Sequence, residues 1–131
     1  MLARTGFLLI LLQALFAAPG AYAQGHAHSH HGGQEVKIGA YEAELVVAGS
    51  EITLYVHDAK DQKVDASGFS ATAVVLAKGS QQKSVDLAPA GENKLTGRFD
   101  FPVEGKFRAT VTLKTASGEV GKGRFNLDVK R

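Results

Sequence analysis

The chain has 131 residues, enough for one domain, and its 15 basic and 13 acidic residues are interspersed along it. It therefore lacks the clustered basic face that nucleic-acid binding requires, and we expect no nucleic-acid partner. It contains no cysteine, which excludes thiol catalysis, thiolate metal sites and iron–sulfur clusters.

Residues 1–23 have the pattern of a secretory signal peptide. Arg4 supplies the positive charge, residues 7–18 form an apolar run, and Ala21-Tyr22-Ala23 is a small-x-small cleavage site. The apolar run is shorter than the roughly 20 residues that span a bilayer. We therefore expect cleavage after Ala23, a periplasmic or secreted protein, and no membrane span after processing.

Residues 24–34 form a histidine-rich segment, which we expect to be flexible. In an extended chain, His26, His28 and His30 point to one side, and His31 can approach from the other. Imidazole is the commonest protein ligand for transition metals. Without cysteine, and without Met1 once the leader is removed, the donors are nitrogen and oxygen only. This set predicts a divalent ion such as Cu(II), Zn(II), Ni(II) or Co(II), with Cu(II) or Zn(II) favoured.

Cleavage after Ala23 has a further consequence for the new chain end, which is Gln24-Gly25-His26. The free amine of Gln24, two deprotonated backbone amides and the imidazole of His26 form a four-nitrogen square plane. That geometry suits Cu(II) and Ni(II). Cyclisation of Gln24 to pyroglutamate removes the amine and with it this site.

Residues 35–131 alternate between apolar and polar side chains with a period of two, which predicts β-strands. The clearest run joins Phe107 to Leu113, and Gly49-Ser50 suits a type II′ hairpin turn. Turn signals recur often enough for seven or eight short strands, and no segment has a helical period. We therefore predict an all-β fold, an immunoglobulin-like antiparallel β-sandwich, with a small β-barrel as the alternative. By the same parity, the phenylalanines are core candidates.

Several polar residues of this domain are weaker metal-ligand candidates. His57 shares its parity with Thr53 and Tyr55, opposite the apolar face, so we expect it to be exposed at a strand end. We expect the carboxylates to lie on the solvated face as well. They reach a metal only if the histidine-rich segment folds back onto that sheet. This group of weaker candidates consists of the Gln24 amine, Glu42, Glu44, His57 and Asp58.

Catalytic motifs are absent from the sequence. There is no Ser-His-Asp arrangement, phosphate-binding loop or zincin motif, so we do not expect an enzyme.

Three short stretches carry a family resemblance: residues 31–34 (HGGQ), 39–46 (GAYEAELV) and 55–58 (YVHD). In these the chain resembles small exported β-sandwich proteins, and the related modules of periplasmic adaptors (membrane-fusion proteins), associated with heavy-metal efflux of the resistance-nodulation-division type. Glu42 stands where that group tends to carry histidine, which keeps a donor but hardens the site. The resemblance implies metal buffering or delivery, with a periplasmic efflux adaptor or transporter as partner.

Together these features predict an exported protein that binds a divalent transition metal in connection with heavy-metal efflux or resistance. The alternative is a non-metal envelope protein-interaction module in which the histidine-rich segment is an incidental spacer.

Overall fold

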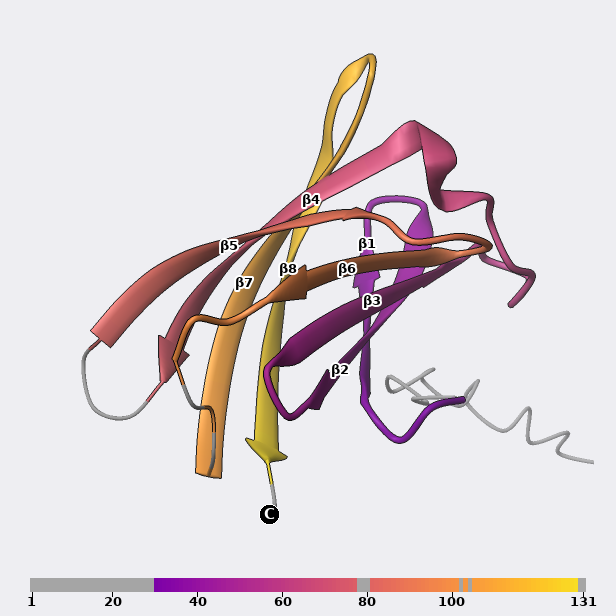
Figure 1. Cartoon of the computed structure of the whole chain (residues 1–131). Helices are drawn as coiled ribbons and strands as arrows, with labels where there is room; N and C mark the ends of the chain where they lie inside the picture. The colour runs from indigo at the N-terminus through magenta and orange to yellow at the C-terminus, as the bar shows by residue number, and fades with distance from the viewer. Residues whose placement is uncertain (1–29, 78–80, 102, 104, 130–131) are drawn as a thin grey trace, which may run out of the picture.

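The computed structural model describes residues 30–77, 81–101, 103 and 105–129. The expected signal peptide and the candidate ligands Gln24, His26 and His28 lie outside these residues. Within the described part of the chain, no helix has the length and apolar character needed to cross a membrane. The regular elements are one short 3-10 helix (Ala66–Gly68) and the strands β1 (Gln34–Ile38), β2 (Tyr41–Ala48), β3 (Glu51–His57), β4 (Phe69–Ala77), β5 (Gln81–Pro89), β6 (Lys94–Arg98), β7 (Gly105–Thr115) and β8 (Gly118–Val129) (Figure 1).

Alternating side chains account for the strands, and β7 shows this most clearly. Phe107, Ala109, Val111 and Leu113 are buried, whereas the residues between them are exposed or half-buried. The pleat sends successive side chains to opposite faces, so one face packs into the core and the other meets solvent. The Gly49-Ser50 turn joins β2 to β3, and Gly49 has the positive φ, 61°, that a type II′ turn requires at its first central position.

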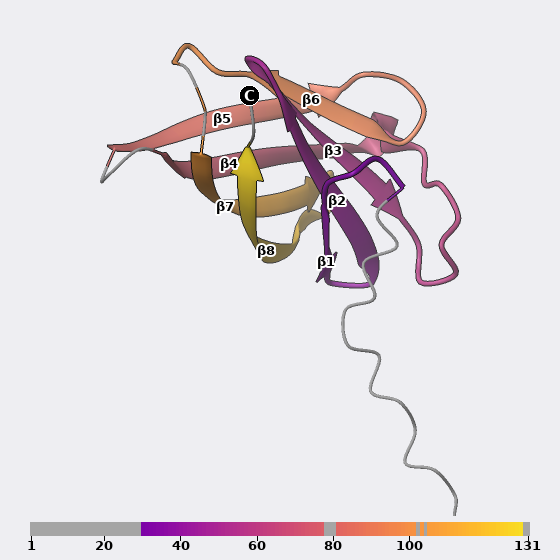
Figure 2. The same ribbon diagram turned by 90° about the horizontal axis from the view of Figure 1, so that it is seen from below.

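The strands form one antiparallel sheet in the order β1-β2-β3-β6-β5-β4-β7-β8. Strand β5 links its two halves, because residues 81–87 pair with β4 whereas Ala88 and Pro89 pair with β6. The sheet curls until β1 lies beside β8 (Figure 2). The predicted all-β fold is therefore confirmed with eight strands, and the curled single sheet corresponds to the small β-barrel given as the alternative to a sandwich.

Side chains and close backbone packing, rather than a hydrogen-bonded ladder, close the seam between β1 and β8. Gln34 accepts a hydrogen bond from the backbone N–H of Asn126 through its side-chain oxygen, at 2.6 Å. Gly123 leaves the space that Ile38 fills, since a Cβ at this position would lie 2.8 Å from Cγ1 of Ile38. The seam therefore depends on a glycine in β8 facing a large side chain in β1.

Replacing Gly123 by alanine is expected to lower the free energy of unfolding by about 1–3 kcal/mol, because the added methyl group overpacks the seam. The matched control is Gly68→Ala, where the new methyl group meets no atom within 4 Å. Urea denaturation of both variants measures the difference. Equal stability of the two variants would contradict this account of the seam.

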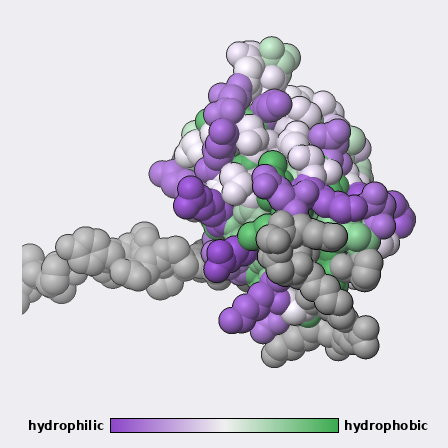
Figure 3. Space-filling model, turned by 90° about the vertical axis from the view of Figure 1, so that its left-hand side faces the viewer, coloured by the Kyte–Doolittle hydropathy of each residue, from purple (hydrophilic) through white to green (hydrophobic). Residues whose placement is uncertain are grey.

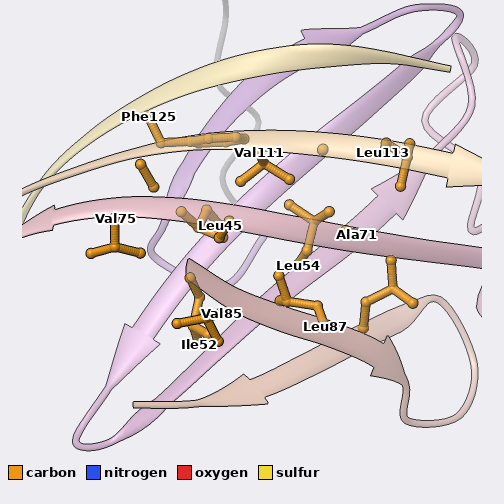
Figure 4. Close-up of a cluster of buried hydrophobic side chains, with 14 of the residues drawn as sticks. Leu45, Ile52, Leu54, Ala71, Val75, Val85, Leu87, Val111, Leu113 and Phe125 are labelled. Atoms are coloured by element: carbon orange, nitrogen blue, oxygen red, sulfur yellow. The ribbon is translucent and has the colours of Figure 1, made fainter. Parts of the chain in front are cut away.

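The core lies inside the curled sheet, with side chains contributed by both halves. Leu45, Ile52 and Leu54 of the first half face Val75, Val111 and Phe125 of the second (Figure 4). The predicted phenylalanines are confirmed as core residues at positions 69, 99, 107 and 125, whereas Phe101 is half-buried. On the face shown in Figure 3, hydrophilic side chains are spread over much of the surface, with apolar side chains visible between them.

Candidate metal centre

The candidate centre lies on the outer face of β1, β2 and β3, opposite the core. Cross-strand pairing places Glu35, Glu44 and Tyr55 in one row and sets Glu42 beside His57 in the next. Residues paired across neighbouring strands project to the same face. The predicted parity of Glu42, Glu44 and His57 is therefore correct. Their predicted exposure is wrong for two of them, since Glu44 is 0% and His57 only 3% exposed.

These two residues are buried because residues 30–33, here called the docked segment, fold back over the face. Glu44 holds this segment by accepting hydrogen bonds from the backbone N–H groups of His30, His31 and Gly33, at 3.1, 2.9 and 2.9 Å. A carboxylate that receives several N–H donors is well compensated for its burial. Instead of a flexible segment up to residue 34, the chain is therefore held from His30 onward, and Gln34 already belongs to β1.

His31 anchors the docked segment in a second way. Its ring stacks on Tyr55 with the centroids 3.6 Å apart and the planes 2° from parallel. Its Nδ1 lies 3.0 Å from Oε1 of Glu44. His31 therefore fixes the segment to β2 and β3 and takes no part in the histidine–aspartate cluster described below.

Two glycines let the backbone come this close to the sheet. Gly32 has a φ of 78°, a left-handed conformation that other residues adopt at a cost. A Cβ at Gly33 would collide with the backbone carbonyl oxygen of Leu45. The pair Gly32-Gly33 is therefore a structural requirement for turning the chain back from β1 towards the end of β3.

The loop that follows β3, residues 58–62, supplies a further carboxylate. Asp58 shapes this loop, because its Oδ1 accepts hydrogen bonds from the backbone N–H groups of Lys60 and Gln62 at 2.8 and 2.9 Å. Asp61 then adopts a φ of 62°, a conformation for which aspartate is one of the more tolerant residues. Asp58 therefore builds the loop, and Asp61 is the residue whose side chain reaches the docked segment.

His30, His57 and Asp61 converge at this point, and we call them the ligand cluster. Nε2 of His30 lies 3.0 and 3.1 Å from the two carboxylate oxygens of Asp61. The rings of His30 and His57 have their centroids 5.0 Å apart. One ligand atom from each of the three residues lies within 4.8 Å of the others. Nδ1 of His57 is buried without a hydrogen-bond partner among the described residues, which is costly for a polar atom.

This spacing is close to what a metal ion requires. Ligand atoms at 2.0–2.1 Å from a tetrahedral Zn²⁺ lie about 3.3 Å apart, so the cluster needs to contract by no more than about 1.5 Å. Two imidazoles and one carboxylate are a donor set suited to divalent transition metals. Three protein ligands leave at least one position for water or another donor.

The chain matches no protein-family model, no curated protein and no solved structure. The resemblance to proteins associated with heavy-metal efflux therefore stays a prediction.

A pair of carboxyl groups, Glu35 and Glu42, borders the ligand cluster and forms a second trio with Asp61, again with ligand atoms within 4.8 Å. Burial raises the pKa of Glu35 to about 7, and its hydrogen bond with Glu42 and the charges of Glu42 and Asp61 act in the same direction. The hydrogen bond to Asp61 raises the pKa of His30. The clustered carboxylates thus make it easier for Glu35 and His30 to hold a proton. The same negative charge favours the binding of a metal cation.

Replacing Glu35 by glutamine is expected to flatten the pH dependence of the metal-free protein's stability. Because the pKa of Glu35 is raised from 4.5 to about 7, the folded protein binds this proton more tightly than the unfolded chain does. Its contribution to stability is present below about pH 4.5 and is lost as the pH rises towards 7. Urea denaturation at about pH 5 and about pH 8 should show the native protein losing stability relative to Glu35→Gln. Parallel profiles would contradict the raised pKa.

The candidate ligands suggested by the sequence thus fall into two groups in the structure. The fold brings His30 and His57 together with Glu42 nearby, whereas Glu44, His31 and Asp58 support the site by holding the segment and the loop. Asp61 was missed, because in the sequence it is one polar residue of a polar loop. The available signal was its place four residues after His57, with Asp58 between them positioned to form an Asx turn.

A groove lies on another part of the molecule, over β4, β7 and β8. Its volume is about 560 Å³, and it is lined by Val74, Leu76, Gln82, Arg108, Arg124 and Asn126, among others. Among the described residues, no histidine, aspartate or glutamate lines it, so they offer no strong metal ligand there. We therefore place the candidate centre at the ligand cluster and not at this groove.

Proposed function

We propose that this protein is an exported metal-binding protein that holds one divalent transition metal ion at the ligand cluster. The observation that carries the proposal is the convergence of two imidazoles and a carboxylate from three separated parts of the chain, with one ligand atom of each within 4.8 Å of the others. Export is supported by the signal-peptide pattern of residues 1–23. A role in buffering or delivering the ion, in connection with heavy-metal efflux, is supported by the family resemblance alone.

The donor set narrows the class of metal. It contains nitrogen and oxygen but no sulfur, which favours Zn(II), Cu(II), Ni(II) or Co(II) over Cu(I). The neighbouring Glu35 and Glu42 add negative charge close to the ion. His26 and His28 lie upstream of the docked segment and remain predicted additional ligands, as does the amine of Gln24.

Calorimetric titration of the processed protein with Zn²⁺ and Cu²⁺, combined with NMR spectra of its histidine rings, tests the proposal. We expect one equivalent of metal to bind first and to shift the ring signals of His30 and His57. Affinity should fall as the pH is lowered, since protons compete for His30, whose pKa is raised by Asp61. Ring shifts confined to His26 and His28 would place the site in the upstream segment instead, and no uptake of either metal would refute the proposal.

A second candidate function, protein interaction without metal, is favoured by the groove over β4, β7 and β8. Val74 and Leu76 form half-buried apolar surface on the outside of the sheet, and Arg108 and Arg124 flank it. Neither arginine has an ion-pair partner in the part of the chain that the structure describes. These features suit an acidic segment of another protein.

Titration with a short polyglutamate peptide distinguishes this second function. It should shift amide signals of β7 and β8, and the double substitution Arg108→Gln and Arg124→Gln should abolish the shifts without changing metal binding. Arg98→Gln, on β6 in the other half of the sheet, is the matched control for the loss of charge. Shifts that persist in the double variant would refute a role for this groove.

A further inference from the structure

We propose that Glu44 is the positioning residue of the metal site: it assembles the site by docking residues 30–33 and does not itself bind the ion. This role rests on the proposed function. The three ligands differ in how firmly the fold holds them. His57 ends a strand of the sheet, and Asp61 belongs to a loop whose backbone is closed by hydrogen bonds at Asp58. His30 alone comes from the docked segment, so the completeness of the site depends on whether that segment is held.

Glu44 is the main feature that holds it. Its carboxylate accepts hydrogen bonds from three backbone N–H groups of the segment and lies 3.0 Å from Nδ1 of His31. No other group in the described part of the chain accepts a hydrogen bond from these three backbone N–H groups. Without the negative charge, several donors would compete for a neutral acceptor, and neutral hydrogen bonds are weaker than charge-assisted ones.

The burial of Glu44 argues that its role is specific to the segment. A carboxylate that is 0% exposed on the outer face of a sheet is unfavourable unless its charge is compensated. The docked segment supplies the compensation, and the stack of His31 on Tyr55 adds a contact that excludes water. Segment and carboxylate therefore stabilise each other, and His30 is placed against Asp61 before any ion arrives.

Preorganisation of this kind is expected to raise affinity, because the ordering of the ligand is completed before binding. The coupling is reciprocal. If docking of residues 30–33 strengthens metal binding, then a bound ion must stabilise the docked state by the same factor. The amides of His31 and Gly33 should consequently exchange more slowly with solvent in the presence of Zn²⁺ than in its absence.

The test compares Zn²⁺ affinity and amide exchange in the native protein, Glu44→Gln and Gly33→Ala. Both variants undock the segment and keep all three ligands: the first weakens the acceptor, and the second places a methyl group against the carbonyl of Leu45. We expect each to lose amide protection at His31 and Gly33, to keep protection in β4 and β7, and to bind Zn²⁺ at least about 10-fold more weakly. Glu51→Gln, an exposed residue at the start of β3, is the matched control.

The outcomes separate the two proposals. A native protein that takes up neither Zn²⁺ nor Cu²⁺ refutes the proposed function and, with it, this role of Glu44; if Cu²⁺ alone binds, the same variants are compared with Cu²⁺. Native-like affinity in Glu44→Gln or in Gly33→Ala, with the segment's amides exchanging freely, refutes the positioning role and leaves the metal site standing. If Glu44→Gln does not fold, Gly33→Ala decides the question, since it leaves the carboxylate in place.

Discussion

Replacing His57 by alanine is expected to lower the affinity for Zn²⁺ by roughly 100-fold or more, because it removes the most deeply buried ligand of the cluster. His57 is 3% exposed, and its Nδ1 has no hydrogen-bond partner among the described residues, which is costly for a buried polar atom. Calorimetric titration with Zn²⁺ measures the loss. Circular dichroism verifies that the sheet is retained.

The informative control for this substitution is the double variant His26→Ala and His28→Ala, which removes the same type of side chain from the upstream segment. If the ligand cluster is the principal site, this double variant keeps most of the affinity. The opposite result, with affinity retained in His57→Ala and lost in the double variant, would show that the metal binds to the histidine-rich segment and not to the folded domain.

The largest effect on stability is expected for Phe107→Ala, with a loss of about 3–5 kcal/mol in the free energy of unfolding. Phe107 is 1% exposed and packs edge-to-face against Phe99, with the ring centroids 5.6 Å apart. A domain of this size has a total stability of about 5–15 kcal/mol, so the variant should be close to unfolding. Urea denaturation followed by circular dichroism measures the change.

Phe101→Ala is the matched control for Phe107→Ala, since it removes the same atoms from a half-buried site beside Phe99. It should destabilise the protein by much less, because less apolar surface is exposed and no closed cavity remains. Similar losses in the two variants would indicate that the interior packs differently from the structure described above.

The strands could be predicted from the sequence because apolar and polar residues alternate along a strand that is buried on one face only. Phe107 to Leu113 illustrate this, and the same rule placed Glu42, Glu44 and His57 together on the face opposite the core. A sandwich was predicted and the barrel was only the alternative, because alternation fixes which side of a strand is buried but not how far the sheet curls.

The candidate site could be predicted only in part, because it depends on contacts between distant positions. Glu44 is buried because residues 30–33 turn back at Gly32 and cover it. No local sequence pattern indicates which surface such a segment will contact. The position of the Asp61 side chain depends on the positive φ of this one residue within a polar loop. His30 and His57 could be predicted as possible ligands from their residue type. That the two side chains lie close together could not be predicted from their spacing along the chain.

The one-sided pairing of β1 has a consequence for how the protein could give up an ion. Among the described strands, β1 forms a backbone ladder with β2 alone, and its contact with β8 consists of the hydrogen bond from Asn126 to the side chain of Gln34 and close packing at Gly123. Its detachment would break the ladder with β2 and the three hydrogen bonds to Glu44 but no ladder on the β8 side, so we expect residues 30–38 to open as one unit of local unfolding. Fraying of this unit would withdraw His30 and Glu35 together while His57 and Asp61 stay with the body of the domain. If the proposed site holds a metal ion, its release would then require only a local opening of the sheet edge, and the rest of the sheet would remain intact.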